Sequence, residues 1–250
     1  MKTQEKNFDG IKLSGFTAIL IMLALTGTAI YLLSLPQTPS IIAGVICGIC
    51  VVVMLPGFMI IQPNNSRVLT FFGRYAGTVI SNGFYWVNPL FLKSTVTLRI
   101  LNLNIDPIKV NDKVGNPIMI GAVVVWRIKD TYKASFDISG NIREFVQIQS
   151  DAALRQVAGM YAYDTNETID KVTLRSDESG EITQRLEDEL NSRLAIAGIE
   201  IVEARINYLA YASEIASVML RRQQADAIIS ARERIVEGAV SMVHLALEKL

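Results

Sequence analysis

The chain has 250 residues, of which half are apolar, and its 24 basic residues are balanced by 24 acidic ones. A chain of this length holds one or two domains. The balanced charge argues against a nucleic-acid-binding protein, because such proteins carry an excess of basic residues on one face. The apolar residues concentrate before Gln62, which predicts a membrane-anchored part followed by a soluble part.

Two apolar segments without any charged residue occupy residues 13–35 and 41–61. About twenty apolar residues in a helix cross the hydrocarbon core of a bilayer, so both segments are predicted to be transmembrane helices. The first is longer than the apolar region of a signal peptide and is followed by a poor cleavage site, so we expect it to be retained. Pro56 and Gly57 leave open a shallow re-entrant helix as the alternative to a second full span.

The connector between these segments, residues 36–40, is short and contains no Lys or Arg. Helices joined so closely form a hairpin, and both ends of a hairpin leave on one side of the membrane. Basic residues flank it on both ends, at Lys2, Lys6, Lys12, Arg67 and Arg74. By the positive-inside rule, we expect a cell-membrane protein with a hairpin or multi-pass anchor and a cytoplasmic soluble part.

Cys47 and Cys50 form a C-x-x-C motif in the middle of the second apolar segment. In soluble proteins this spacing indicates redox chemistry or half of a zinc site. A thiolate is disfavoured in an apolar span, and the sequence has no second Cys/His pair to complete a metal site. We therefore interpret both cysteines as helix-packing residues and expect no metal ion.

Short β-favouring runs and turn signals follow the apolar segments. Asn82-Gly83 is predicted to form a hairpin turn between two strands, and Pro89 to end the second strand. Residues 94–105 alternate between apolar and polar with a change of register, which predicts one bulged strand. The most strand-like run is Ile118–Ile128.

Two helices and a further strand are predicted next. The first helix starts after Asn141, a suitable N-cap with Glu144 three residues later, and has one apolar face. The second covers Glu181–Ala197, and Gly198 is a fitting stop. The run after Gly198 alternates like a strand. Strands and helices in this order predict an α+β fold.

Residues 213–250 contain one glycine and no proline, which predicts a single helix about 55 Å long. Apolar residues recur along it with heptad spacing. A continuous apolar row on a lone helix would be exposed to water, so we expect the helix to pack against copies of itself. The predicted interface residues are Ile215, Val218, Arg221, Arg222, Ile229, Arg232, Val236 and Val243.

The aromatic run "NGFYWVNPLF" lies shortly after the second apolar segment. Trp and Tyr are favoured at bilayer interfaces, and we predict membrane contact for Tyr85, Trp86, Leu90 and Phe91. Phe84 and Trp86 share one face of a strand. They are expected either to fill the core of the first sheet or to support Leu90 and Phe91 as a tip that dips into the membrane.

Several blocks in a fixed order resemble the band 7, or SPFH (stomatin–prohibitin–flotillin–HflK/C), family. These are "FGRYAGT" followed by "GFYWVNPL", then "KVNDKVGNPIMIGAVVVWRIKDTYKASFDI", "FVQIQSDAALRQVAGMYAYD" and "INYLAYASEIASVMLRRQQADAIISAR". The resemblance covers roughly residues 56–250, and the double apolar N-terminus is most similar to a prokaryotic slipin-like branch. Ala212 departs from the family pattern, in which proline is common. The resemblance implies three parts: a membrane anchor (1–62), an SPFH domain (63–212) and a helical oligomerisation arm (213–250).

The resemblance implies a homo-oligomeric membrane scaffold that forms rings or cages and organises a membrane microdomain. The alternative is a regulatory subunit that binds a membrane protease or channel without closing a cage. Expected partners are copies of the chain, membrane lipids and a membrane protein, and no nucleic acid. The family carries no catalytic residues, and the sequence lacks phosphate-loop, zinc-protease and nucleophile-elbow motifs. We therefore expect no enzymatic activity, no catalytic residue and no cofactor.

Overall fold

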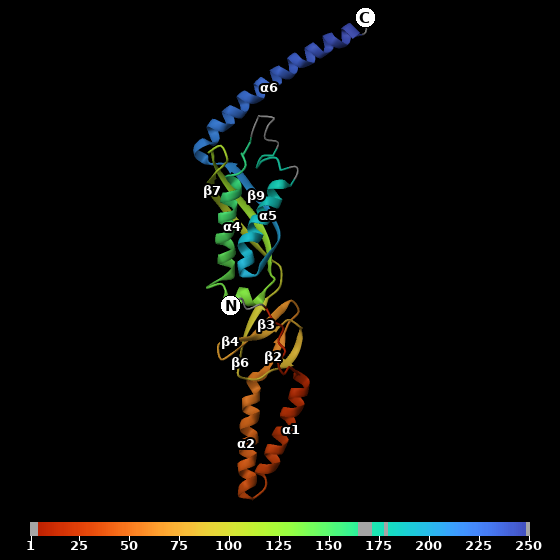
Figure 1. Cartoon of the computed structure of the whole chain (residues 1–250), viewed down its shortest axis with the longest axis vertical. Coiled ribbons are helices and arrows are strands. Elements are labelled where there is room, and N and C mark those ends of the chain that lie inside the picture. The colour runs from red at the N-terminus through yellow and green to blue at the C-terminus, as the bar shows by residue number, and fades with distance from the viewer. Residues whose placement is uncertain (1–4, 165–171, 178–179, 249–250) are drawn as a thin grey trace. The chain divides into compact units, whose positions relative to one another are not determined.

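A computed structural model describes residues 5–164, 172–177 and 180–248 (Figure 1). Lys2 and the last two residues of the predicted arm lie outside these ranges. The chain divides into two compact units. Unit 1 contains residues 1–101, 126–145 and 191–202, and unit 2 contains 102–125, 146–190 and 203–250. The predicted domain boundaries after residues 62 and 212 stay predictions.

The helices and strands of the described residues alternate in blocks, as expected for the predicted mixed fold. The helices are α1 (Gly15–Leu33), α2 (Thr38–Met54), α3 (Thr131–Phe136), α4 (Ile142–Ala158), α5 (Glu181–Leu194) and α6 (Ser213–Glu248), with 3-10 turns η1 (Leu55–Gly57) and η2 (Ala195–Ala197). The strands are β1 (Leu13–Ser14), β2 (Phe58–Ile61), β3 (Asn65–Phe71), β4 (Arg74–Val79), β5 (Gly83–Trp86), β6 (Phe91–Thr97), β7 (Leu101–Asn111), β8 (Pro117–Ile128) and β9 (Ile199–Tyr211).

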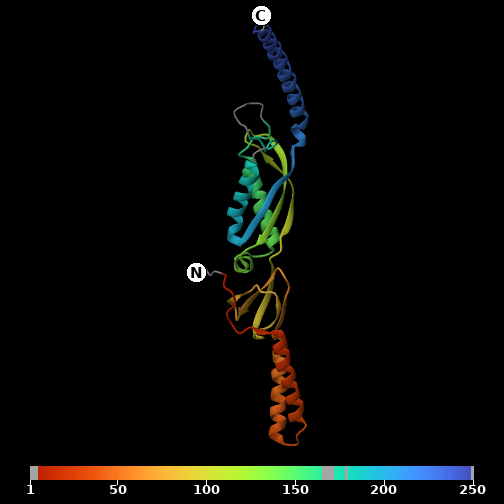
Figure 2. The same ribbon diagram turned by 90° about the vertical axis from the view of Figure 1, so that its right-hand side faces the viewer.

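The helices α1 and α2 lie side by side as the predicted hairpin (Figures 1 and 2). They approach closely at small residues: Ala18 and Ala29 are buried, and a Cβ on Gly44 would lie 2.8 Å from Leu33 Cγ. Most of the large apolar side chains on both helices are exposed. Both α1 and the stretch Thr38–Gly57 are long and apolar enough to cross a membrane.

The second apolar segment is not helical to its predicted end. The α-helix stops at Met54, η1 follows, and Phe58–Ile61 forms strand β2. Pro56 lacks the N–H that would continue the helical ladder, and Gly57 is a weak helix former. Apolar composition alone does not separate a lipid-facing helix from a buried strand, so this boundary could not be placed from composition.

Two small sheets form the rest of the N-terminal part of unit 1, with strand orders β1-β5-β2 and β4-β3-β6. The core of this region contains Met59, Ile61, Leu69, Val79 and Val87. Its turns differ from the prediction. Asn82-Gly83 does not join a hairpin, because β4 pairs with β3 whereas β5 pairs with β1 and β2. The tight hairpin turn is Phe72-Gly73, where φ is 46° and 80°.

Strand β2 leads away from α2, and β3 returns. The turn between them, Gln62–Asn65, is closed by a hydrogen bond from Asn65 N–H to the Gln62 carbonyl (3.1 Å). Pro63 occupies its second position and Asn64, with φ of 58°, its third, which is the residue pattern of a type II turn. The Phe71 end of β3 is therefore directed back toward the end of α2.

Residues 94–105 form parts of two strands and not one bulged strand. Strand β6 ends at Thr97, residues 98–100 have no regular structure, and β7 begins at Leu101. The two strands belong to different sheets. The change in apolar register along the sequence thus marks a change of sheet.

The strands β7, β8 and β9, most of whose residues belong to unit 2, form a sheet in that order. Figure 2 shows α4 and α5 against one face of this sheet. Alternate residues of the strands are buried, and so are apolar residues of both helices. These residues include Leu103, Ile105, Ile118, Ile120, Val124, Leu154, Ile182, Leu186 and Leu190. The predicted strand 118–128 and both predicted helices are confirmed.

The opposite face of this sheet is bridged by two amides. Asn207 of β9 donates from Nδ2 to Asn104 Oδ1 of β7 (2.8 Å) across the central strand. Gly121 lies beneath this bridge, and a Cβ there would lie 3.1 Å from Asn207 Oδ1. A glycine in a central strand therefore allows the two edge strands to be connected directly.

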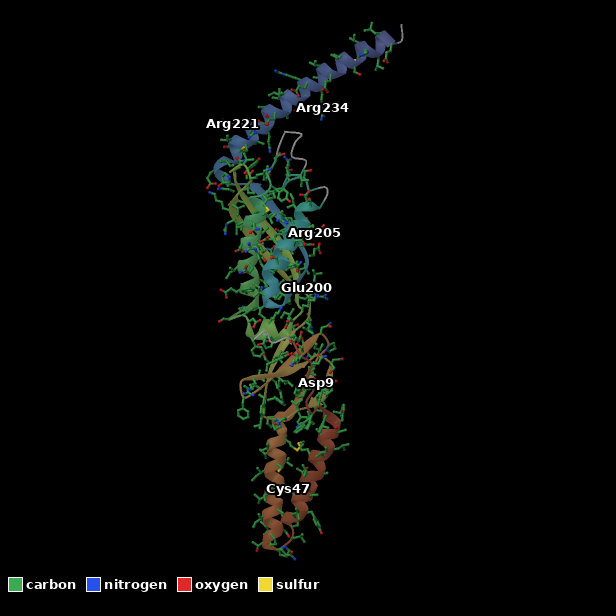
Figure 3. The ribbon with its side chains drawn as sticks, viewed as in Figure 1. Asp9, Cys47, Glu200, Arg205, Arg221 and Arg234 are labelled. Carbon is green, nitrogen blue, oxygen red and sulfur yellow. The ribbon has the colours of Figure 1, made fainter. Side chains whose placement is uncertain are left out.

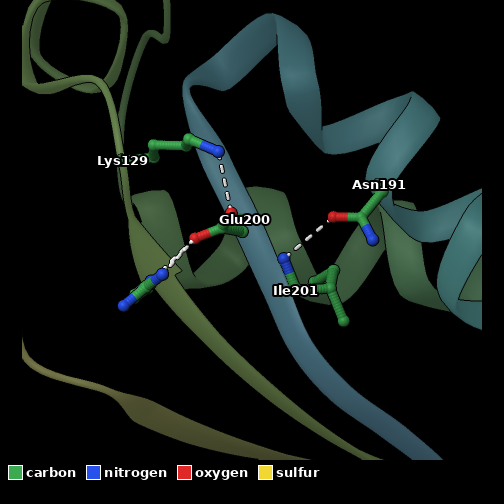
Figure 4. Close-up of polar contacts among 5 residues, drawn as sticks. Lys129, Asn191, Glu200 and Ile201 are labelled. Atoms are coloured by element: carbon green, nitrogen blue, oxygen red, sulfur yellow. Dashed lines mark hydrogen bonds and ion pairs between the residues drawn. The ribbon is translucent and has the colours of Figure 1, made fainter.

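The start of β9 is held in unit 1 by a glycine turn and by charges. Gly198 has φ of 68°, and its carbonyl accepts hydrogen bonds from the N–H groups of Lys129 (2.8 Å) and Asp130 (3.0 Å). Glu200 then forms ion pairs with Arg127 (2.7 Å) and Lys129 (2.8 Å), and Figure 4 shows the pair with Lys129. The same figure shows Asn191 Oδ1 accepting from Ile201 N–H (3.0 Å).

The long helix α6 confirms the predicted helical arm. Its N-terminus is fixed within unit 2 by buried Ala212 and by an ion pair between Glu214 and Lys109 of β7. No residue of α6 among 213–248 is buried. Arg221 and Arg234, labelled in Figure 3, lie along this helix.

Candidate functional site

The strand β5 is the centre of a small sheet at the base of the helical hairpin. Its neighbour β1 leads directly into α1, and its other neighbour β2 follows directly after α2 and η1. In the register of this sheet, Trp86 pairs with both Leu13 and Phe58. One strand thus ties together the two points at which the apolar helices enter the soluble part. We name this region, residues 11–14, 55–61 and 83–93, the anchor base.

Trp86 binds the end of α2. Its indole Nε1 donates a hydrogen bond to the Met54 carbonyl (2.9 Å), one of the carbonyls that have no partner within the helix. The ring lies against Gly57, where a Cβ would lie 2.3 Å from Nε1. A half-buried Trp whose indole N–H forms a hydrogen bond is typical of the boundary between an apolar and a polar region. The predicted lipid contact of Trp86 stays a prediction.

Lys93 also binds the end of α2, and sequence reasoning missed it. Its ammonium group donates to the carbonyls of Pro56 and Phe58 (3.3 Å to the latter). A cation at a helix C-terminus is favourable. Burial, with a smaller contribution from Arg67, lowers the pKa of Lys93 from its ordinary value. Because Lys93 lies 37 residues after Pro56, only the tertiary fold brings them together.

Tyr85 lies on the opposite face of β5 from Phe84 and Trp86. It packs on the core that contains Leu69 and Val79, and Lys12 Nζ lies 4.6 Å from the centre of its ring. The expectation that Phe84 and Trp86 fill this core is wrong. Alternation on the strand was predicted correctly, but the sequence does not show which face is inward.

Phe84 packs at the beginning of α1 instead. Its ring centre lies 5.6 Å from that of Phe58, in a stacked arrangement, and 5.6 Å from that of Phe16, edge to face. The chain at Gly15 passes so closely that a Cβ there would lie 2.2 Å from Phe84 Cδ1. Phe84 thus supports the first turn of α1.

Leu90 and Phe91 have different environments. Leu90 is exposed, whereas Phe91 is half-buried and packs against the core of unit 1. Phe91 also contacts two other aromatic rings, Phe8 at 5.4 Å and Phe71 at 5.3 Å. Lipid contact stays a prediction for both residues, and Phe91 has mainly protein neighbours.

The segment before α1 binds to the same unit as the strands after α2. Backbone hydrogen bonds connect Phe8 N–H to the Thr78 carbonyl (3.1 Å) and Thr78 N–H to the Lys6 carbonyl (2.9 Å). The Thr78 hydroxyl is 2.9 Å from that of Thr131, which donates to a Glu5 carboxylate oxygen (2.6 Å). Thr78 and Thr131 are buried. The two ends of the helical hairpin are therefore fixed to one folded unit.

Seven of the eight predicted oligomer residues follow one heptad row on α6, and Arg221 lies beside this row, seven residues before Ile228. Ile215 is half-buried at the start of the helix, and the other seven are exposed in the single chain. Arg222 lies 3.8 Å from Asp226 one turn later on the same helix. The apolar members, among them Val236 and Val243 at 61% and 60% exposure, have no cover within the described residues.

A second apolar row on α6 was not recognised from the sequence. Its large members are exposed to the same degree as the predicted ones: Ile228, Ile235, Met242 and Leu245. Ala231 and Gly238 lie between them at alternating spacings of three and four residues. The spacing of these residues is visible in the sequence. The assignment of one heptad row, however, places them beside that row and not in it.

The described residues contain no group of three or more His, Cys, Asp or Glu side chains placed to hold a metal ion. Cys47 and Cys50 are free thiols on α2, and Figure 3 shows Cys47 on this helix. The features described at the anchor base are packing contacts and helix caps, and those on α6 are rows of exposed apolar side chains.

Comparison with known proteins identifies a family. A search of curated proteins returns no match. The model of the SPFH domain / Band 7 family matches residues 59–239, which include the anchor base from β2 onward and most of α6. The chain therefore belongs to the SPFH domain / Band 7 family.

Proposed function

We propose that this protein is a membrane-anchored scaffold whose copies assemble through α6 into ring- or cage-like particles. Each particle would enclose a patch of membrane and organise the lipids and proteins in it. Proteins of this family are generally membrane-associated scaffolds, and the assembly is our inference for this chain. The observation that carries it is the pair of apolar rows on α6.

The two rows lie on adjacent faces of the helix. Row 1 contains Val218, Ala225, Ile229, Val236 and Val243, and row 2 contains Ile228, Ala231, Ile235, Gly238, Met242 and Leu245. Members of the two rows are neighbours in the sequence, as at residues 228 and 229, so the rows are offset by one residue. One residue corresponds to about 100° around an α-helix. Row 1 and row 2 therefore face different neighbours.

A two-stranded coiled coil needs one row on each helix. A helix with two rows in different directions buries both only if it contacts two other helices. When row 1 of one copy packs on row 2 of the next, the contact is heterologous, and such contacts close into rings when the rotation between copies allows it. This geometry favours a ring over a dimer.

The fixed ends of the helical hairpin support the anchoring part of the proposal. Residues 5–8 and the strands after α2 bind to one folded unit, so a hairpin that spans the bilayer places both on one side. The distribution of Lys and Arg around the hairpin favours the cytoplasmic side. The proposed partners are copies of this chain, membrane lipids and an enclosed membrane protein such as a protease. We assign the protein no enzymatic role.

The mass of the particle extracted in a mild detergent tests the proposal. We expect a homogeneous assembly of many copies that persists on dilution. A monomer at all concentrations would refute the scaffold. The alternative function, a regulatory subunit that binds one membrane protease or channel, predicts a stoichiometric foreign protein and little self-association in the same extract.

A further inference from the structure

The turn between β3 and β4 has an unusual residue at its tip. Both central residues of this turn, Phe72 and Gly73, have positive φ (46° and 80°). Turns of this kind strongly favour Asn-Gly or Asp-Gly, because a side chain with a Cβ is strained there and bulky residues most of all. An aromatic residue in this backbone conformation indicates that its side chain serves a purpose outside the turn.

Phe72 is also among the most exposed apolar side chains of the described residues, at 78%. It is not loosely attached. Its neighbour Phe71 lies 4.8 Å from it, edge to face, and Phe71 in turn lies 5.3 Å from Phe91. Phe91 packs on the core of unit 1. A continuous row of rings therefore leads from the core to the exposed tip and holds it in place.

Exposed apolar residues surround the tip on one side. Phe71 pairs with Phe91, and Thr70 pairs with the exposed Leu92. Leu90, also exposed, comes just before this pairing. Arg74 follows the turn and is exposed. Large apolar side chains next to an arginine form the composition that is favoured at the boundary between lipid and water.

The tip lies at the end of unit 1 to which the apolar helices are attached. Val87 N–H donates to the Gly57 carbonyl just after α2 (3.0 Å), and Phe91, only four residues later, pairs with Phe71. Four residues span at most about 14 Å. A membrane that contains α1 and α2 would therefore lie next to the tip.

We propose that the Phe72 turn is a second membrane contact, in which Phe72 inserts into the interfacial region of the lipid leaflet and Arg74 remains at the headgroups. This inference rests on the proposed anchoring of α1 and α2 in the bilayer. A second copy of the chain is the less suitable occupant, because a single turn is far smaller than the roughly 800 Å² per partner that a stable protein interface buries. The contact would give unit 1 a second point of attachment to the membrane, in addition to α1 and α2.

Depth-dependent quenching tests the contact in the full-length chain. A Cys47→Ala, Cys50→Ala background receives Phe72→Cys, which is labelled with the fluorophore NBD and reconstituted into vesicles of phosphatidylcholine and phosphatidylglycerol. The matched control is Asn64→Cys, an exposed residue that also has positive φ but lies at the opposite end of β3. We expect blue-shifted emission at position 72, at least twofold stronger quenching by a lipid spin-labelled near the headgroup than at position 64, and protection from aqueous iodide.

Flotation of the vesicles separates this inference from the proposed function. If the protein floats with the vesicles and iodide quenches position 72 as strongly as position 64, the membrane contact of Phe72 is refuted while the anchor stands. If position 72 is protected from iodide but not quenched by lipid, a protein surface covers it, and the inference is also refuted. If the protein does not float, the anchoring proposal fails first, and the inference that rests on it falls too.

The variant Phe72→Asn provides a test that misfolding cannot imitate. Asparagine suits this turn better than phenylalanine, so we expect a higher melting temperature in detergent together with a loss of lipid contact. The loss is read from NBD at Leu90→Cys, whose emission should shift to the red when Phe72 is replaced. A lower melting temperature would show that Phe72 is a structural residue, and unchanged emission at position 90 would refute its contact with lipid.

Discussion

Lys93 of β6 is, with Trp86 of β5, one of the residues that hold the end of α2. It donates to two carbonyls, those of Pro56 and Phe58. We expect Lys93→Met to lower the free energy of unfolding by about 1 kcal/mol, since two acceptors lose a charged donor. Thermal unfolding in detergent measures this change. Lys93→Arg, which keeps the donors, should retain most of the stability, and equal melting of wild type and Lys93→Met would contradict the assigned cap.

Gly198 is required because its φ is positive and because a neighbouring carbonyl leaves no room for a Cβ. A Cβ at this position would lie 2.6 Å from the Asp130 carbonyl oxygen. Gly180 has nearly the same φ, 69° against 68°, and among the described residues no atom beyond its chain neighbours lies within 4 Å of its Cβ position. We expect Gly180→Ala to lower the free energy of unfolding by about 1 kcal/mol through backbone strain alone, and Gly198→Ala to lower it by clearly more. Chemical denaturation of both variants measures the difference, and equal losses would show that the close approach is unimportant.

Glu200 predicts a pH dependence of stability. Hydrogen bonds from Lys129 and then Arg127 lower its pKa from the ordinary value of 4.5. The folded protein therefore binds a proton at Glu200 less readily than the unfolded chain, so these bonds stabilise the fold above about pH 4.5 and are lost as the pH falls through the lowered pKa. We expect Glu200→Gln to lose at most about 1 kcal/mol at pH 7. The difference between the melting curves of the two proteins should shrink as the pH falls below 4.5; a constant difference would contradict the assignment.

Residues whose interaction partners lie close to them in the sequence were predicted correctly. The cap at Asn141, which accepts a hydrogen bond from Arg143 N–H (2.9 Å), and the stop at Gly198 are examples. Sequence reasoning missed Lys93 because the carbonyls that Lys93 binds are distant in the chain. One of its two alternatives for Phe84 and Trp86 placed them in the core, where Tyr85 lies instead, because alternation defines two faces without naming the buried one.

At the scale of elements, the helices were predicted well because they are long and strongly periodic. The small strands were predicted less well. The β3–β4 hairpin turns at Phe72-Gly73, a pair that does not match the usual turn pattern, whereas the typical pair Asn82-Gly83 connects different sheets. Strand pairing depends on contacts that are distant in sequence, and turn residues alone do not determine it.

The two rows on α6 give a prediction that separates a ring from a dimer. If row 1 of one copy packs on row 2 of the next, an unpaired carboxylate in either row disrupts every contact. We expect Ile229→Asp in row 1 and Ile235→Asp in row 2 to dissociate the particle equally. Ser230→Asp adds the same charge away from both rows and should leave the particle intact. Light scattering of the detergent extract measures its mass.

The effect of Ile235→Asp, the variant in row 2, distinguishes a ring from a dimer. A dimer that uses row 1 alone would be broken by Ile229→Asp and would tolerate Ile235→Asp. Val236→Asp should behave like Ile229→Asp, because both residues belong to row 1. If these three variants keep the mass of the wild-type particle, as Ser230→Asp should, α6 is not the assembly surface.

At the scale of the whole molecule, ordered sequence blocks identified the family, and the match over residues 59–239 confirmed it. The geometry of the proposed assembly could not be predicted in this way. Ring closure depends on the angle between neighbouring copies, which neither the sequence nor the structure of one chain contains. The exposed rows of α6 and the fixed ends of the hairpin are the features on which the proposed assembly and the proposed membrane anchor rest.

Imaging of single particles extracted with their lipid retained tests the central claim most directly. Our account predicts a closed ring of identical chains, with neighbouring α6 helices in contact along both rows and a patch of lipid inside the ring at the level of α1 and α2. Separate single chains, or pairs joined along one row with no enclosed lipid, would contradict it.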